Sequence, residues 1–191
     1  MLGNTILFIV GTLGDLFAAA LLLRFYLQLL RAPYRNPLSQ FLAALTDFIV
    51  RPARKVIPGL WGMDLSTLVL GWLTELLLQL LVFWLKDYDL GASMGVTLVA
   101  VALLALLQVI KISLYLLMGA VFAQAILSWV NPHSPAAPML NSLTRPFLHP
   151  FQRLIPAIGN VDLSPLFLLL AIQVALMLPV AWLEAQIAHF F

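Results

Sequence analysis

The sequence predicts an all-α membrane protein in which four transmembrane helices form two parallel repeats, each with a cytoplasmic amphipathic helix in its loop. Hydrophobic residues make up 63% of the 191 residues and charged residues only 9%, whereas a soluble domain has about 25% charged residues. Lipid must therefore cover most of the surface. The chain also contains four long apolar runs, and its second half repeats a pattern of the first.

Each apolar run is long enough for one span of about 20 residues. The runs cover about 2–30, 66–85, 94–130 and 164–183, separated by proline-rich basic loops at 31–63 and 131–161. The third run would extend about 55 Å as a single helix, beyond a hydrocarbon core of about 30 Å. Two crossings would need a buried turn that the sequence does not signal. We therefore expect one long helix that tilts, protrudes or breaks near Gly119.

The two halves share a motif at a fixed offset. Sliding the chain by 98 positions superposes Pro37 on Pro135 and Pro52 on Pro150. Such matches indicate an internal duplication, which divides the chain into a first repeat, 1–93, and a second, 94–191. The same offset superposes Ile57-Pro58 on Ile155-Pro156 and Asp64-Leu65-Ser66 on Asp162-Leu163-Ser164.

The basic residues gather in the two loops, and Lys and Arg beside spans favour the cytoplasmic side. We therefore expect both loops in the cytoplasm, both termini in the periplasm and the chain in the cytoplasmic (inner) membrane. This makes the repeats parallel, unlike the inverted repeats of many secondary transporters. No Lys or Arg precedes Arg24, so we expect the first span to be retained rather than cleaved as a signal peptide. The loop residues are Arg31, Arg35, Arg51, Arg54, Lys55, Arg145 and Arg153.

Each loop is predicted to contain an amphipathic helix. In the first loop Asn36 is a capping residue and Pro37 suits the first helical position. The second copy is predicted to start at Ser134-Pro135 and to be shorter because of Pro138 and Pro146. These helices lie either in the headgroup region or against the protein itself. The apolar residues are Leu38, Phe41, Leu42, Leu45, Phe48 and Ile49, and then Met139, Leu140, Leu143 and Phe147; Ser39, Gln40, Ala43, Thr46 and Asp47 take the other side of the first helix.

A proline-bracketed basic turn is predicted after each loop helix. Because proline fixes φ, the prolines would present the basic side chains in a set geometry. The targets would be anionic lipid headgroups or an acidic partner, and simple membrane anchoring is the alternative. The basic residues are Arg54 and Lys55 between Pro52 and Pro58, and Arg153 between Pro150 and Pro156.

The second and fourth spans begin with the same residues. Ser66 and Ser164 are predicted to cap their helices, with Pro165 at the first helical position. Asp64 and Asp162 would place negative charge near the positive helix ends. We expect these four polar residues to have a structural role.

Four ionisable residues lie inside the predicted spans, where a charge is costly and needs a partner. Counted from the cytoplasmic helix ends, Arg24 lies about 9 Å deep and Glu75 about 13 Å. Asp15 lies about 22 Å deep and Lys111 about 25–28 Å. These depths predict two ion pairs, Arg24 with Glu75 and Asp15 with Lys111. The alternative is a proton or cation path through Asp15, Glu75 and Lys111.

No sequence motif indicates catalysis. A glycine-rich phosphate loop, a histidine metal-binding spacing and a nucleophile elbow are all missing from the sequence. The chain also has no cysteine, which excludes thiolate chemistry. We therefore expect no enzyme activity, no catalytic residue, no cofactor and no metal site. Because the basic residues flank spans, we expect no direct contact with nucleic acid.

The repeated residues resemble the YggT family, which is called YlmG in Gram-positive bacteria and plastids. The two copies are similar to its proteobacterial form, and the resemblance covers nearly the whole chain. Thr67 and Gln152 depart from the family's usual Pro and Arg. The resemblance implies an inner-membrane or thylakoid protein linked to osmotic tolerance, to membrane and nucleoid distribution around division, and to cytochrome b6 maturation in chloroplasts. It rests on Asn36-Pro37, Pro52-x-Arg54-Lys55-x-Ile57-Pro58 and Asp64-x-Ser66, and on Pro150-x-x-Arg153-x-Ile155-Pro156 and Asp162-Leu163-Ser164-Pro165.

Together these observations predict a non-enzymatic protein that organises the cytoplasmic membrane or assembles a complex in it through the two loops. The expected partners are the lipid bilayer with its anionic lipids, other membrane proteins and a further copy of the chain. The alternative function is a small ion or osmolyte channel or transporter, with Asp15, Glu75 and Lys111 lining its path.

Overall fold

The protein is built from helices, four of which are long and apolar enough to cross a membrane. The computed structural model describes residues 2–33, 36–59, 63–85, 94–131, 133–155 and 162–189. The predicted fold class of a four-span helical membrane protein is thereby confirmed. The elements are α1 (Leu2–Leu29), α2 (Pro37–Val56), α3 (Leu65–Leu85), α4 (Met94–Val130), α5 (Ala137–Leu154), α6 (Ser164–Ala175), η1 (Leu176–Val180) and α7 (Ala181–Ala188).

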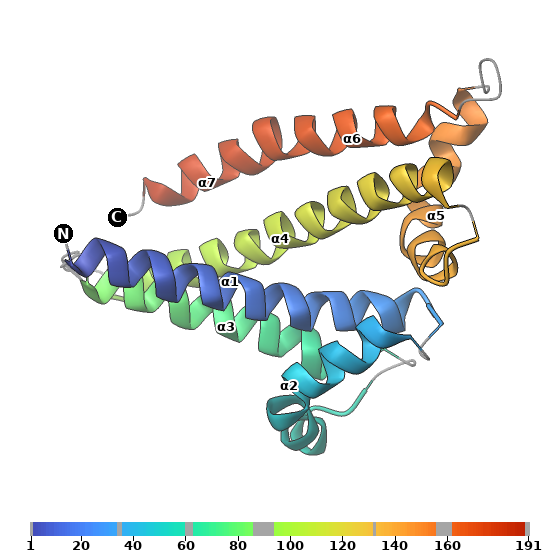
Figure 1. Cartoon of the computed structure of the whole chain (residues 1–191). Coiled ribbons are helices and arrows are strands. Elements are labelled where there is room, and N and C mark those ends of the chain that lie inside the picture. The colour runs from blue at the N-terminus through green and yellow to red at the C-terminus, as the bar shows by residue number, and fades with distance from the viewer. Residues whose placement is uncertain are drawn as a thin grey trace.

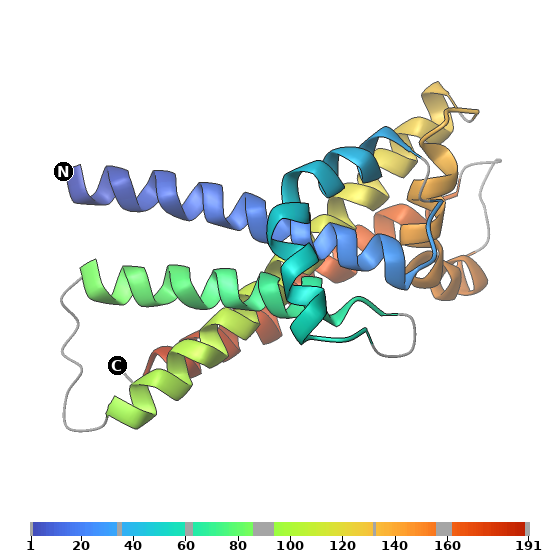
Figure 2. The same cartoon turned by 90° about the horizontal axis from the view of Figure 1, so that it is seen from below.

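Helix α4 is continuous, as predicted, and Gly119 does not break it. Figure 2 shows that α4 runs obliquely to α1 and α3. Tilting is the way in which a helix longer than the hydrocarbon core fits into a bilayer. The predicted single long helix is therefore confirmed.

The last span is longer than predicted and contains a wider turn. It continues from α6 through the π-helical η1 into α7 and ends at Ala188 rather than near 183. The π-helical turn contains Pro179. Proline has no N–H to donate and its ring clashes with the preceding turn, so one wider turn accommodates it without ending the helix.

Both loop helices lie at the same end of the long helices, whereas the start of α1 and the end of α7 lie at the opposite end (Figures 1 and 2). In each half the first long helix runs toward the end that carries the loop helices, and the second long helix runs back from it. The two halves therefore have the same orientation. This parallel arrangement agrees with the sequence prediction.

The two loop helices begin at or near the predicted residues. Helix α2 begins at Pro37, as predicted, and the Asn36 side chain accepts a hydrogen bond of 2.7 Å from the Ser39 backbone N–H. Helix α5 begins at Ala137, later than the predicted Pro135.

Prolines do not end either loop helix. Helix α2 continues through Pro52, and α5 continues through Pro146 and Pro150. All three prolines are solvent-exposed. The carbonyl that each one leaves unpaired can thus be satisfied from outside the protein. The predicted proline-bracketed turn after each loop helix is therefore wrong, because Arg54 and Lys55 belong to the last turn of α2 and Arg153 belongs to the last turn of α5.

Helix α1 is the centre of the packing. Ala18 and Leu22 of α1 pack with Val109 and Ile112 of α4. Toward the loop-helix end, α1 also packs against both loop helices, with Leu27 in one cluster with residues of α2 and α5. A separate cluster joins α4 and α5 to α6. Large apolar side chains elsewhere on the spans stay exposed, as lipid-facing surfaces require.

Candidate functional site

Each loop helix buries one face against the spans. In α2 the buried residues are Ser39, Leu42, Thr46 and Val50, so the prediction that Ser39 and Thr46 lie on the opposite side of the helix from Leu42 is wrong. Thr46 can be buried because its hydroxyl donates to the Leu42 carbonyl over 2.6 Å. In α5 the buried residues are Met139, Leu143, Thr144 and Leu148.

The aromatic face of α2 is mostly exposed, although Phe48 packs on Phe17 of α1 with ring centroids 5.9 Å apart. Phe41 is 61% exposed and Phe48 is 71% exposed, with Leu45 between them also exposed. Exposed side chains of this size on one helix face are typical of a surface that meets lipid or another protein.

Arg24 connects the first span to this loop helix. Its Nη1 atom donates to Thr46 Oγ1 and to Asp47 Oδ1, both over 2.7 Å. Arg51 donates to the second oxygen of the same carboxylate, Oδ2, over 2.9 Å. The predicted pair of Arg24 with Glu75 is therefore wrong. The prediction compared the depths of charges inside the spans only, and so it left out Asp47 on the loop helix.

The charges around Asp47 hold its carboxylate ionised. The hydrogen bond from Arg24 lowers the pKa of Asp47, and the bond from Arg51 acts in the same direction. Arg24 is only 6% exposed, so its guanidinium needs this carboxylate to be ionised.

The second repeat builds the equivalent contact without charges. Thr144 is equivalent to Thr46 and its hydroxyl hydrogen-bonds to the Gln124 side chain. Phe122 occupies the position of Arg24, and Arg145 occupies the position of Asp47. The two loop helices are therefore attached to the spans by different chemistry.

A second polar link joins the end of each loop helix to the start of the next span. Arg54 Nε donates to Asp64 Oδ2 over 3.0 Å, and its Nη2 contacts the same oxygen. At the equivalent positions Gln152 Nε2 donates to Asp162 Oδ2 over 2.9 Å. Arg54 is thus paired within the protein while its side chain stays 44% exposed, and its predicted role toward lipid headgroups or an acidic partner stays a prediction.

The predicted serine caps are also wrong. Ser66 lies inside the first turn of α3, and its hydroxyl donates to the Ile57 carbonyl over 2.9 Å. In the second repeat the N-cap position is Leu163, which makes no side-chain capping bond, and Asp162 before it accepts at Oδ1 from the Ser164 backbone N–H over 2.8 Å. Although partial burial opposes it, hydrogen bonds from Ser164 and Gln152 lower the pKa of Asp162. The negative charge predicted at this helix start is present.

The remaining basic residues of the motif lie at the surface. Lys55 and Arg153 are exposed, as are Pro58 and Pro150. Pro156, the last residue of the second predicted turn, lies outside the described residues.

Inside the spans, Lys111 of α4 pairs with Glu184 of α7. Lys111 Nζ lies 3.0 and 3.2 Å from the two carboxylate oxygens of Glu184. The predicted pair of Lys111 with Asp15 is therefore wrong. Depth fixes only one coordinate, and the packing of α7 against α4 places Glu184 within ion-pair distance of Lys111.

Asp15 instead belongs to a carboxyl cluster shared by three helices. It lies close to Glu75 of α3 and to Gln108 of α4, near enough for polar interaction. Glu75 is only 1% exposed. Within the described residues, its Oε1 atom has no hydrogen-bond partner. Lys111 is near enough to act on Asp15 electrostatically without contacting it as an ion pair.

Sequence reasoning missed Asp47, Gln108, Gln124 and Glu184 as interaction partners. Glu184 directly follows the last predicted span and would have been found if span ends had been included, whereas Asp47 lies in the middle of the predicted loop 31–63 and had no such signal. The pairing of Arg54 with Asp64 had a signal in the duplication, because positions 54 and 152 both carry a donor and positions 64 and 162 both carry aspartate.

Four apolar helices with two polar-anchored loop helices at one end define a multi-pass helical membrane protein. A family model described as CCB3/YggT matches residues 3–85 and 103–183. The chain belongs to the CCB3/YggT family, as the sequence resemblance indicated.

The relatives extend over nearly the whole chain. An uncharacterized protein of Pseudomonas aeruginosa is 38% identical over 187 residues, covering 97% of this chain and 93% of that protein. The uncharacterized protein YggT of Escherichia coli K12 is 32% identical over 172 residues, covering 90% of this chain and 87% of that protein. No solved structure matches.

Proposed function

We propose that this protein organises the cytoplasmic membrane or assembles complexes within it, without catalysing a reaction. The observation that supports this proposal is the loop-helix end. Both loop helices are fixed to the spans by buried contacts, while α2 leaves Phe41, Leu45 and Phe48 exposed. A fixed helix with an exposed aromatic face suits docking to a lipid surface or to a partner helix.

The charge distribution supports a cytoplasmic location for this end. Exposed Arg51, Lys55, Arg145 and Arg153 all belong to the two loop helices. Basic residues beside spans stay in the cytoplasm, which would place the start of α1 and the end of α7 in the periplasm. Anionic lipids of the inner leaflet are attracted to such residues.

The processes served are those that the family resemblance implies: tolerance of osmotic stress and events of the cell envelope and division. A further copy of the chain or another membrane protein is the partner that this proposal requires. The exposed apolar face of α2 gives the partner a defined place to bind.

Photo-crosslinking in native membranes tests the proposal. A photoreactive phenylalanine analogue at Phe48 should give a discrete protein adduct. The same analogue at Leu77, which is 66% exposed on the span α3, should give lipid adducts. Lipid adducts alone at both Phe41 and Phe48 would remove the partner-docking role of this face.

A second candidate function is a small ion conduit, and the carboxyl cluster favours it. Glu75 is fully buried within spans, and one of its oxygens lacks a partner among the described residues. Two carboxyl groups that share a buried site repel each other when both are ionised, which favours a proton on one of them. Ionisable residues inside spans often mark proton or cation pathways.

Purified protein in liposomes distinguishes the two candidates. A conduit predicts proton or cation flux that Glu75→Gln abolishes and that Asp162→Asn, outside the spans, leaves unchanged. Absence of flux in sealed liposomes that contain folded protein would eliminate the conduit and leave the organising role.

A further inference from the structure

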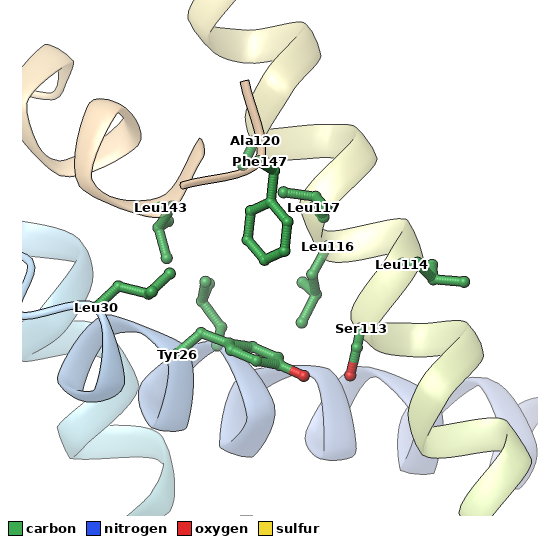
Figure 3. Close-up of a pocket in the computed structure, with 10 residues that line it drawn as sticks. Tyr26, Leu30, Ser113, Leu114, Leu116, Leu117, Ala120, Leu143 and Phe147 are labelled. Atoms are coloured by element: carbon green, nitrogen blue, oxygen red, sulfur yellow. The ribbon is translucent and has the colours of Figure 1, made fainter. Parts of the chain in front are cut away.

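An apolar cavity lies where α1 and α4 meet the loop helix α5. Its volume is about 150 Å³. Figure 3 shows Tyr26 and Phe147 pointing into the same space, with Leu143 on one side and Leu117 on the other. An engineered apolar cavity of about this volume binds benzene. The space is therefore large enough for a segment of hydrocarbon chain.

A polar pocket adjoins this cavity at the C-terminal end of α1. It is lined by Asn141, Ser142, Arg145 and His149 of α5. Leu30 lines both spaces, so the apolar cavity and the polar pocket meet at this side chain. A molecule with a polar head and an apolar chain would fill both.

The internal duplication shows why the polar pocket is cationic. In the first repeat Asp47 neutralises Arg24 and Arg51. In the second repeat the equivalent positions hold Arg145, Phe122 and His149, so the carboxylate has been replaced by a guanidinium. Across the described part of the chain, the ion pairs formed do not include Arg145 or His149. The second loop helix therefore exposes a cation that has no ion-pair partner among the described residues.

We propose that the two spaces together bind one anionic phospholipid, with its phosphate at Arg145 and one acyl chain passing Leu30 into the apolar cavity. Arginine suits this role because its planar guanidinium donates two parallel hydrogen bonds to a phosphate. Asn141 adds an amide donor. The apolar cavity selects a lipid over a free phosphate, because a free phosphate would leave the cavity unfilled. This site needs no protein partner and stands independently of the proposed function.

Lipid titration of the full chain in detergent micelles, followed by native mass spectrometry, tests the site. Dioleoylphosphatidylglycerol should bind with a discrete stoichiometry and dioleoylphosphatidylcholine should bind much more weakly. Arg145→Gln should weaken phosphatidylglycerol binding about tenfold, since it removes a charge-assisted contact. Arg153→Gln removes the same charge from the exposed end of α5, outside both spaces, and should weaken binding much less, because Arg153 contributes only diffuse attraction.

The apolar half of the site has its own test. Ala120→Leu fills the cavity and should weaken binding about tenfold by excluding part of the acyl chain. Ala125→Leu, the same change on α4 away from the cavity, should have no effect. If Ala120→Leu does not fold, Ser113→Leu narrows the cavity from the same helix.

Three outcomes would overturn the inference. Equal losses from Arg145→Gln and Arg153→Gln would show only diffuse attraction to the basic helix. Equal binding of the two lipids would show no recognition of charge. Displacement of phosphatidylglycerol by an equal concentration of inorganic phosphate would make this an anion site that does not use the apolar cavity.

Discussion

At the scale of single residues, Arg24 and Lys111 each pair with a carboxylate that packing brings close in space, not with the one at the same predicted depth. Arg24 is buried in α1 and bonds to Asp47 on a loop helix, although Glu75 lies at a similar predicted depth. Lys111 bonds to Glu184 rather than to Asp15. A buried charge that loses its partner is costly, so these side chains hold the loop helix and the last span in place.

Replacing Arg24 should therefore destabilise the protein more than replacing Arg51. Arg24→Leu removes two hydrogen bonds from a buried guanidinium and should lower the free energy of unfolding by about 2 kcal/mol. Arg51→Leu removes an exposed partner and should cost less than about 1 kcal/mol. Unfolding by SDS titration in micelles measures both. A cost for Arg24→Leu/Asp47→Leu equal to the sum of the single changes would contradict the pairing.

The Asp47 carboxylate makes stability depend on pH. Because its folded pKa lies below the ordinary value of 3.8, the unfolded chain binds more protons between the two values, and stability rises with pH in that window. The contribution is complete above the unfolded pKa and is lost as pH falls through the folded one. Asp47→Asn should flatten the decline in thermal midpoint below about pH 4. An unchanged acid decline in this variant would show that other carboxylates cause it.

At the scale of elements, both repeats use one link between the end of a loop helix and the start of a span. Arg54 with Asp64, and Gln152 with Asp162, stand at equivalent positions. The two links differ in burial, since Asp64 is 4% exposed and Asp162 lies at the surface. The duplication thus preserved a contact while its strength diverged.

This divergence predicts unequal effects of the same substitution. Asp64→Ala should cost about 2 kcal/mol, because a buried, charge-assisted interaction is lost. Asp162→Ala should cost about 1 kcal/mol, because its bonds are solvent-accessible. Thermal unfolding of the two variants in the same detergent gives the comparison. A larger loss of stability for Asp162→Ala than for Asp64→Ala would contradict this ranking and show that burial does not determine the strength of the two links.

At the scale of the whole molecule, four crossings place both loop helices at one end of the bundle (Figure 1). The chain contains no cysteine, so single cysteines report on topology without background. Cysteines at Lys55 and Arg153 should react with a membrane-impermeant maleimide from the same side of the membrane. A cysteine at Gln186, near the end of α7, should react from the other side. Labelling of positions 55 and 153 from opposite sides would contradict the parallel arrangement.

The number of spans, their approximate ends and the start of α2 followed from the sequence. Apolar side chains must be removed from water whatever their neighbours are, so run length alone marks a span. The capping function of Asn36 is likewise local, because it depends on residues within one turn. The division of the chain at residue 93 stays a prediction.

The tertiary structure alone decided the charge partners, the face that each loop helix buries and the continuation of α5 through two prolines. Each of these depends on which element lies beside which, and on the rotation of each helix about its axis. Spacing along the chain gives depth but not direction. Arg24 pairs with Asp47 and hydrogen-bonds to the buried Thr46. Both contacts depend on the orientation in which α2 packs across α1, and only the folded molecule specifies this orientation.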